Sequence, residues 1–254
     1  MSPVGSSSSA APDDRRFFFV HIQKAAGTSL FTRLRRMFGR SAVYPDDTDG
    51  ELTTVAPQMV PEQLVARWAV RGDQIRVVAG HLPLCTTELL PVDFTTLTVL
   101  REPVERTLSY LRHHRVLVAE DRDKPLEEIY DDPFRFHGMV HNHMVKMFSL
   151  TTDEMTSGML TRVEFTPDRL ARAKERLASV DVVGLQEDFD GFCGELETRF
   201  GWDLGAPVVA NTTAPTEVPP SLVARILEDN ADDVELYEHA RQLLARRGAA
   251  PATD

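Results

Sequence analysis

The sequence predicts an α/β fold, with a central, mostly parallel sheet and helices on both of its faces. Two observations support this class. Four short apolar runs, rich in β-branched and aromatic residues, lack clean alternation, which is typical of strands buried on both faces. Segments with helical spacing lie between these runs, as in successive βαβ units. The predicted strands are Phe17–Ile22, Ile75–Gly80, Thr95–Leu100 and Val180–Leu185.

Two helices are predicted directly after the first and third strands. The first has apolar residues on one helical face, and Gly39 follows as its expected end. The second begins at Pro103, because proline is favoured at the first helical position. The apolar faces are formed by Leu30, Phe31, Leu34, Met37 and Phe38 in the first helix, and by Val104, Leu108 and Leu111 in the second.

Three further helices are predicted toward the C-terminus. Thr166 and Pro167 open one that leads into the fourth strand, and the segment Phe189–Phe200 has apolar residues at helical spacing. A last amphipathic helix is expected from about Pro219 to Arg247 as one continuous element.

The 254-residue length suits one large domain between two short tails. Residues 1–14 consist mostly of Ser, Ala, Pro and Asp with almost nothing to bury, and residues 248–254 are similar. We therefore expect disordered tails at 1–14 and 248–254, and a single domain over 15–247.

Charge and cysteine content limit the possible partners. The chain has 28 basic and 39 acidic residues, a net charge of −11. This disfavours nucleic acid as a partner, because nucleic-acid-binding proteins carry a surplus of Lys and Arg. Cys85 and Cys193 are too few for a disulfide framework, and Cys193 is expected in the core. With no signal-like or membrane-spanning stretch, a cytoplasmic protein without an integral membrane segment is predicted.

The turn after the first strand, in HIQKAAGTSL, is suited to hold an anion. Its small residues, Ala25, Ala26 and Gly27, let backbone N–H groups approach a ligand, and the following helix start adds partial positive charge. The Lys24 ammonium and two hydroxyls, those of Thr28 and Ser29, are expected to point into the same space. A plain tight turn is the alternative. The segment is not a Walker A loop, in which Lys directly precedes Ser or Thr, so an NTPase is disfavoured.

The third strand leads into LREPVERTLSYLRHHR, which places Arg101 at the strand end and Ser109 about two helical turns later. An arginine fork and a hydroxyl in this arrangement can clamp a second phosphate. Alternatively, Arg101 is a structural ion-pair partner of Glu102, Glu105 or Asp93.

The second strand ends in AGHLPL, so His81 is expected at the same edge of the sheet. Histidine has a pKa suited to accept a proton near neutrality, although a purely structural histidine is the alternative. Ligands of parallel sheets bind beyond the carboxyl ends of the strands. Three strand ends therefore deliver an anion cradle, a phosphate clamp and a candidate base to one edge.

These motifs resemble those of PAPS-dependent sulfotransferases, in the branch of the heparan sulfate 2-O- and 6-O-sulfotransferases and their bacterial relatives. HIQKAAGTSL resembles the 5′-phosphosulfate loop HIPKTGGTS, and LREPVERTLSYLRHHR resembles the 3′-phosphate motif R-[DE]-P-V-x-R-x-x-S. AGH, HNHMVKMFS, VVGLQEDFDGF and EDNADDVELYEHARQLL extend the similarity over about residues 17–247.

The resemblance implies a P-loop-like sulfotransferase fold and a role for each motif. Lys24–Ser29 would hold the 5′-phosphosulfate of PAPS, Arg101 and Ser109 its 3′-phosphate, and His81 would be the catalytic base. Three departures from the family pattern are present: Gln23 replaces proline, Ala25-Ala26 replaces Thr-Gly, and Lys146 replaces arginine in the HNHMVKMFS segment.

The expected reaction is in-line transfer of a sulfuryl group from PAPS to an acceptor hydroxyl, with release of PAP and no metal. Lys24 would stabilise the charge that develops on the departing phosphate. A non-catalytic PAPS- or PAP-binding protein and a P-loop-like phosphotransferase are the alternatives. The acidic stretch AEDRDKPLEEIYDD favours a neutral small-molecule or glycan acceptor over a sulfated polymer.

Some polar residues near these motifs have no assigned role. His137, His141 and His143 are close enough in sequence for a zinc site, but no Cys, Asp or Glu nearby completes one. His113 and His114 are expected as surface residues or as neighbours of the nucleotide. Arg106 could reach the site or pair with Glu102.

Overall fold

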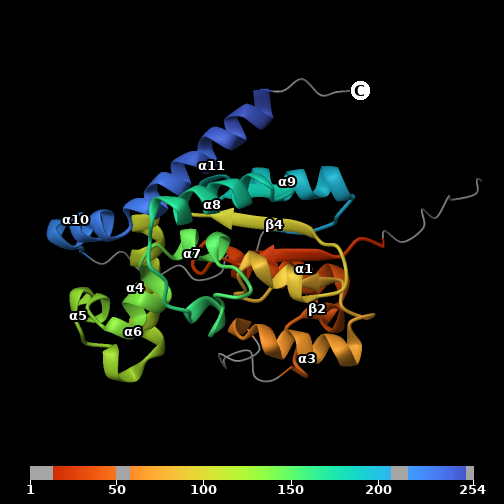
Figure 1. The fold of residues 1–254 in the computed structure, drawn as a ribbon, viewed down its shortest axis with the longest axis horizontal. Helices are drawn as coiled ribbons and strands as arrows, with labels where there is room; N and C mark the ends of the chain where they lie inside the picture. The colour runs from red at the N-terminus through yellow and green to blue at the C-terminus, as the bar shows by residue number, and fades with distance from the viewer. Residues whose placement is uncertain (1–13, 50–57, 207–216, 250–254) are drawn as a thin grey trace, which may run out of the picture.

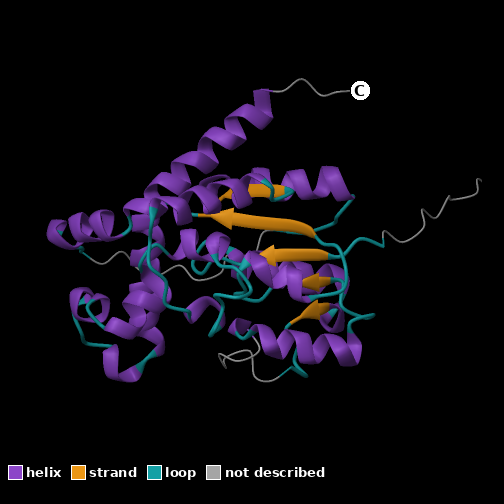
Figure 2. Ribbon diagram, viewed as in Figure 1, coloured by secondary structure: helices purple, strands orange, loops and turns teal. Residues whose placement is uncertain are grey.

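A computed structural model describes residues 14–49, 58–206 and 217–249 (Figure 1). Within them, five parallel strands form one sheet in the order β2-β3-β1-β4-β5 (Figure 2). The strands are β1 (Phe17–Val20), β2 (Val43–Tyr44), β3 (Val77–Val78), β4 (Thr95–Leu100) and β5 (Val182–Leu185). The α/β class and the parallel sheet are confirmed, and β2 is an edge strand that the sequence pattern did not indicate.

The central pair β1 and β4 aligns Phe17 with Thr95 and Val20 with Thr98. From β1 the chain leads toward β2 and β3 on one side, whereas from β4 it leads to β5 on the other. In open α/β sheets, ligands bind where neighbouring strands lead to opposite sides. The loops that follow β1 and β4 meet at this point.

Helices cover both faces of the sheet. Phe17 and Phe19 pack with Leu34 of α1 (Gly27–Phe38) and Leu196 of α9 (Phe189–Phe200). Phe18 and Val20 face a second cluster, formed with α3 (Pro61–Arg71), α7 (His143–Ser149), α8 (Pro167–Ala178) and α11 (Ala231–Ala249). Alternate residues of β1 thus enter two cores, which explains its uninterrupted apolar sequence. Cys193 lies in the first of these cores, as predicted.

The ends of the predicted helices follow from capping residues. Thr166 accepts a hydrogen bond from the backbone N–H of Arg169 at the start of α8. In α4 (Pro103–Leu117), Pro103 occupies the first turn, and the Glu102 carboxylate accepts from two backbone N–H groups. Gly39 ends α1 with a φ of 86°, a value that glycine adopts without steric cost.

The predicted C-terminal helix is wrong as a single element. It is divided into α10 (Pro220–Asp229) and α11, with Asn230 between them. The Asn230 side chain donates to the carbonyl of Ile226 and accepts from the N–H of Asn142, so it is held at the break. The helix also continues through Gly248 to Ala249, two residues into the predicted tail. Residues 1–13 and 250–254 of the predicted tails lie outside the described residues.

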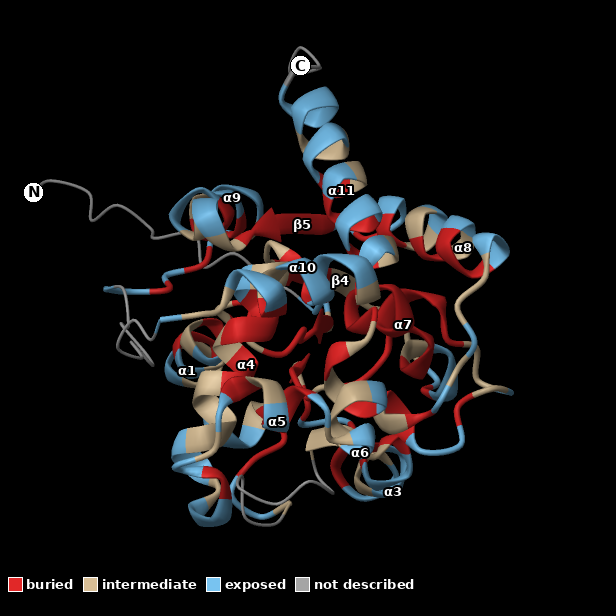
Figure 3. Cartoon of the chain, turned by 90° about the vertical axis from the view of Figure 1, so that its left-hand side faces the viewer, coloured by how far each residue is buried: buried red, intermediate tan, exposed pale blue. Residues whose placement is uncertain are grey.

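Helices α4 and α10 lie beyond the carboxyl ends of the strands, on the left of Figure 1. Buried residues gather in the sheet and throughout α7, which is red along its length in Figure 3. The remaining elements are short: α5 (Leu126–Tyr130), α6 (Pro133–Arg135), a π-helix (Phe136–Val140) and 3₁₀ turns at Arg40–Ala42, Leu84–Leu89, Ala119–Asp121, Gly158–Leu160 and Gln186–Asp188.

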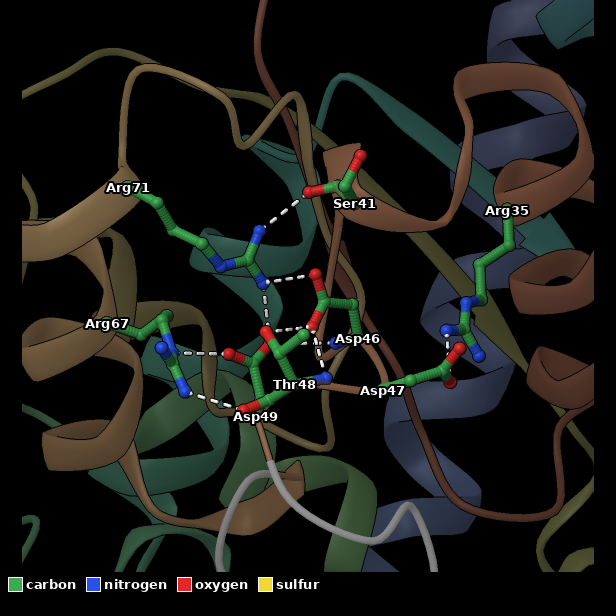
Figure 4. Close-up of polar contacts among 8 residues, drawn as sticks. All are labelled: Arg35, Ser41, Asp46, Asp47, Thr48, Asp49, Arg67 and Arg71. Atoms are coloured by element: carbon green, nitrogen blue, oxygen red, sulfur yellow. Dashed lines mark hydrogen bonds and ion pairs between the residues drawn. The ribbon is translucent and has the colours of Figure 1, made fainter.

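A buried ion-pair network fixes the loop after the edge strand β2 (Figure 4). Arg71 of α3 contacts Asp46 at 3.0 Å and Asp49 at 2.6 Å, and it donates to the carbonyl of Ser41. Arg67, one turn earlier on α3, contacts Asp49 at 2.5 Å. Both aspartates also accept backbone N–H groups of the loop. These carboxylates are therefore satisfied within the fold, and the network joins the two-residue strand β2 to α3.

Candidate functional site

The loop between β1 and α1 has a tightly turned backbone. Lys24 and Ala26 adopt left-handed conformations, with φ of 66° and 62°. A left-handed conformation costs an L-residue other than glycine roughly 1–2 kcal/mol. Ala26 stands where the resembled motif has glycine, so this departure adds strain to the loop while leaving its course possible.

This turn leaves several backbone donors open. The Ala25 N–H bonds to the carbonyl of Ile22, and the Ser29 N–H bonds to that of Ala26. In the part of the chain that the structure describes, the N–H groups of Lys24, Gly27 and Thr28 donate no backbone hydrogen bond of normal geometry. Together with the positive end of the α1 dipole, they suit the predicted anion cradle, and anion binding itself stays a prediction.

Gly27 has a packing role in addition to the one predicted. A Cβ atom at this position would lie 2.0 Å from Cδ2 and from Nε2 of His21, so the imidazole occupies the space of a side chain. His21 is buried, and it stacks on Phe19 with ring centroids 5.0 Å apart. Gly27 is therefore required by internal packing as well as by access to a ligand. Sequence reasoning missed His21, which stands six residues before this glycine.

His81 follows β3 and is held in one tautomer. Its Nδ1 lies 2.8 Å from the carbonyl oxygen of His21, and a carbonyl can only accept. Nδ1 therefore carries the proton, which leaves the Nε2 lone pair free to accept another. The rings of His21 and His81 are 4.0 Å apart, so each restrains the other. Burial lowers the pKa of His81 to about 4, and the nearby Lys24 charge contributes, so the imidazole is neutral at pH 7.

Arg101, at the end of β4, reaches the loop after β1. Its Nη1 donates to the carbonyl oxygen of Lys24 at 3.2 Å, and its Nη2 lies 3.4 Å from the Glu105 carboxylate. The ion pair considered from sequence is thus made with Glu105, but it is long and half-exposed, and such pairs contribute little. Arg101 is joined to the cradle while part of its guanidinium remains accessible.

Lys24 and Arg101 place two cations beside each other. Burial first, and then the charge of Arg101, lower the pKa of the Lys24 ammonium to about 8. No carboxylate within the described residues is among the groups that act on Lys24. An anion bound here would relieve this repulsion and raise the pKa of Lys24.

Ser109 lies at the end of the second turn of α4 and is partly exposed. Within residues 14–49, 58–206 and 217–249 its hydroxyl has no hydrogen-bond partner, so it is available to a ligand. The structure thus brings Lys24–Ser29, His81, Arg101 and Ser109 to the carboxyl edge of the sheet, at β1, β3 and β4.

Arg106 and Lys146 have structural roles, so the prediction that Arg106 reaches the site or pairs with Glu102 is wrong. Arg106 is fully buried and donates to the carbonyls of Met139 and Val140. The Lys146 ammonium, also buried, donates to the carbonyls of His137 and Gly138. These four carbonyls end the π-helix, where helices lack internal donors. The two cations therefore cap one helix end, and burial lowers the pKa of Lys146 to about 7.

Helices α7 and α11 cap each other next to this pair. The buried Asp233 carboxylate accepts from the N–H groups of Met144 and Val145 at the start of α7. In return, the Asn142 side chain accepts from the N–H of Asp233. Burial raises the pKa of Asp233 to about 6, and the Arg106 charge opposes this rise. The start of α7 is therefore fixed by a helix about ninety residues later.

The remaining histidines have separate environments. His114 pairs with the buried Asp121 at 2.8 Å, and the rings of His137 and His141 are 6.2 Å apart. His143 is fully buried, and neither of its ring nitrogens makes a hydrogen bond of good geometry. Among the described residues, no three His, Cys, Asp or Glu side chains are grouped as metal ligands. A metal-independent site stays a prediction.

A surface hollow of about 540 Å³ lies at the opposite edge of the sheet. It is lined by residues just before β1 and β4, among them Arg15, Asp93 and Phe94. These are the amino ends of the strands, where ligands of parallel sheets do not bind. The candidate site therefore remains the open carboxyl edge. In the described residues, no helix combines the length and apolar composition needed to cross a membrane.

Comparison with known proteins adds no assignment, because no family model matches the chain and no curated protein matches it. The geometry of the site is therefore what indicates a function. The parts of the site are open N–H groups, two adjacent cations of which Lys24 has no described carboxylate partner, a free hydroxyl and a neutral imidazole with a fixed tautomer.

Proposed function

We propose that the chain is a PAPS-dependent sulfotransferase that acts on an acceptor hydroxyl. The observation that carries the proposal is the Nδ1–H donation from His81 to the carbonyl of His21, beside the cradle that contains Lys24. It supports a neutral base with an open Nε2 next to an anion site. A plain phosphate-binding module has no need of such a base.

The residues of the cradle fit the co-substrate. The open N–H groups of Lys24, Gly27 and Thr28 and the Lys24 ammonium suit the 5′-phosphosulfate. Arg101 and Ser109 suit the 3′-phosphate, because a guanidinium binds phosphate oxygens in pairs and a free hydroxyl adds a donor.

The proposed step is one displacement at sulfur. The acceptor oxygen forms a bond to sulfur while the bond from sulfur to the bridging phosphate oxygen breaks. The His81 Nε2 takes the hydroxyl proton, and the departing electron pair stays on the 5′-phosphate of PAP. Lys24 and the loop N–H groups stabilise this charge where it develops. A bound polyanion raises the pKa of His81 from its low value, which makes it a stronger base in the complex.

A neutral small-molecule or glycan acceptor remains our proposal. On the acceptor side, Asp121 is satisfied by His114, Lys124 and Arg135, so it is not available to bind a cationic substrate. Lys146 and Arg106 are occupied by carbonyls and offer no fork to a carboxylate.

The first test of this function is binding. Calorimetric titration of the wild-type protein with PAP, and with ATP and Mg²⁺, separates a sulfotransferase from a phosphotransferase. We expect binding of PAP without metal and no binding of ATP. The reverse pattern overturns the proposal.

The second test is turnover. Extracts supplied with PAPS are screened for products that gain the mass of SO₃, with wild type and His81→Ala side by side. We expect His81→Ala to bind PAP normally but to lose about 10²–10⁴-fold in product formation. Normal turnover by His81→Ala would show that the base is another group and would favour a different mechanism.

A further inference from the structure

One face of α4 carries a row of polar side chains that runs away from the loop. Glu105, Ser109 and His113 are spaced four residues apart, so they follow one another along the same helical face. The contact between Glu105 and Arg101 shows which way this row faces. With a rise of 1.5 Å per residue, the row extends about 12 Å from Glu105 to His113.

Lys24 interacts with residues near both ends of this row. Its carbonyl oxygen accepts from Arg101, two residues before α4 begins, and the charge of its ammonium reaches the His113 ring, about three turns into the helix. Burial lowers the pKa of His113, and the charges of Lys24 and then His114 lower it further. These are the charged groups that act on His113, and no described carboxylate is among them.

His113 is therefore a half-buried imidazole that lies within the influence of the Lys24 charge. Within the described parts of the chain it makes no hydrogen bond or ion pair, and neither does the Lys24 ammonium. Its neighbour on the helix, His114, is instead bonded to Asp121 at 2.8 Å. Two basic groups that influence each other without a carboxylate nearby favour the binding of an external anion beside them.

We propose that His113 is a further binding residue of this site, which donates a hydrogen bond to the same anionic group that Lys24 binds. In the free protein the ring is neutral, which avoids repulsion from Lys24. In the complex the anion stabilises the imidazolium, so binding takes up a proton. The identity of the ligand as PAPS or PAP rests on the proposed function, whereas the contact requires only a phosphate-like group.

The test measures binding of PAP and of inorganic pyrophosphate by calorimetry at pH 6 and pH 8. Wild type is compared with His113→Gln and with His114→Gln, a matched control on the same helix. Because a hydrogen bond to a charged group contributes about 1.5–3 kcal/mol, we expect His113→Gln to weaken binding about tenfold or more at pH 6. At pH 8, where protonating the ring in the complex costs more than at pH 6, the loss is smaller. The ligand's own protonation cancels in this comparison because it is the same for each variant.

Two further measurements separate binding from folding. Thermal unfolding establishes that each variant is folded, and His113→Lys supplies a permanent charge that should restore binding at pH 8. Titrations in buffers of different ionisation enthalpy report the proton taken up by wild type, which His113→Gln should reduce.

The outcomes distinguish this inference from the proposed function. Wild-type affinity and proton uptake in His113→Gln would overturn the inference and leave the function standing. Pyrophosphate binding that depends on His113, without binding of PAP, would retain the inference and overturn the function. Absence of binding of either ligand to wild type would overturn both, and an equal loss in His114→Gln would overturn the specific role of His113.

Discussion

Replacing Gly27 by alanine tests how the loop between β1 and α1 packs against the rest of the fold. The new methyl group would lie 2.0 Å from two atoms of the His21 ring, so the ring must move by about 1.4 Å to reach ordinary contact. The ring cannot move freely, because it is stacked on Phe19, lies in a tilted arrangement against His81, and has its Nδ1 3.1 Å from the carbonyl oxygen of Ala79.

The expected cost follows from these contacts. Overpacking a tight core costs about 1–3 kcal/mol, and loss of the bond to Ala79 adds about 0.5–1.5 kcal/mol. The better helix propensity of alanine returns less than about 1 kcal/mol. We expect Gly27→Ala to lower the free energy of unfolding by about 2–3 kcal/mol. For a chain of this size the midpoint of thermal unfolding should fall by roughly 4–12 °C.

Urea and thermal unfolding followed by circular dichroism measure this loss. Gly194→Ala is the matched control, because a Cβ there meets nothing within 4 Å and the position lies inside α9. It should be neutral or stabilising by up to about 1 kcal/mol.

The specific refutation uses a double-mutant cycle with His21→Ala. With the imidazole removed, Gly27→Ala should cost less than about 0.5 kcal/mol. An unchanged cost in that background would show that the His21 ring is not what excludes a side chain.

Two other predictions follow from the charges. Because the pKa of Lys24 in the free protein is about 8, the affinity of the wild type for PAP should fall as the pH rises from 7 to 9. Lys24→Arg should keep its affinity over this range, and Lys24→Met should bind weakly at both pH values. Calorimetry that shows no pH dependence in the wild type would contradict this prediction. Arg71→Met leaves two buried carboxylates short of a partner, so it should lower the free energy of unfolding in urea by about 3–5 kcal/mol. Arg40→Met, which breaks an exposed pair with Asp47, should lower it by less than about 0.5 kcal/mol. Equal losses would show that burial does not determine the contribution of these ion pairs to stability.

The layout of the sheet could be predicted from sequence wherever a strand is buried on both faces. Phe17–Val20 and Thr95–Leu100 have apolar residues without a helical period, and both are strands. The edge strand β2 has two residues, Val43 and Tyr44, too few to produce any pattern. Its position depends on Arg71 and on backbone contacts that are remote in sequence.

Helix α7 shows another case in which hydrophobic periodicity fails to predict an element. All seven of its residues are buried, including His143, Lys146 and Ser149, so the helix has no solvent-exposed face, although these three polar residues stand at helical spacing. The break at Asn230 was missed for a related reason. Asn230 fits an amphipathic helix locally, and its contact with Asn142 decides the local structure.

In the candidate site, residue types that follow strands were predictable and their partners were not. Placement of Lys24, His81 and Arg101 at one edge follows from the rule for parallel sheets. The tautomer of His81 and the packing of His21 on Gly27 depend on distances that no spacing reveals. For Arg106 the sequence did not reveal full burial, which directs the side chain toward carbonyls.

The mutual capping of α7 and α11 has a consequence for the order in which the chain acquires its structure during synthesis. Asn142 and Asp233 are 91 residues apart, so α7 lacks its carboxylate cap when its own residues have just been made. At 5–20 residues per second this interval lasts roughly 5–20 s. During that time the apolar side chains of α7, which belong to the core of the finished protein, stand on a segment without its carboxylate cap. The nascent chain therefore stays exposed to aggregation until Asp233 has been made. A protein that ends before Asn230 would lack the Asp233 cap permanently.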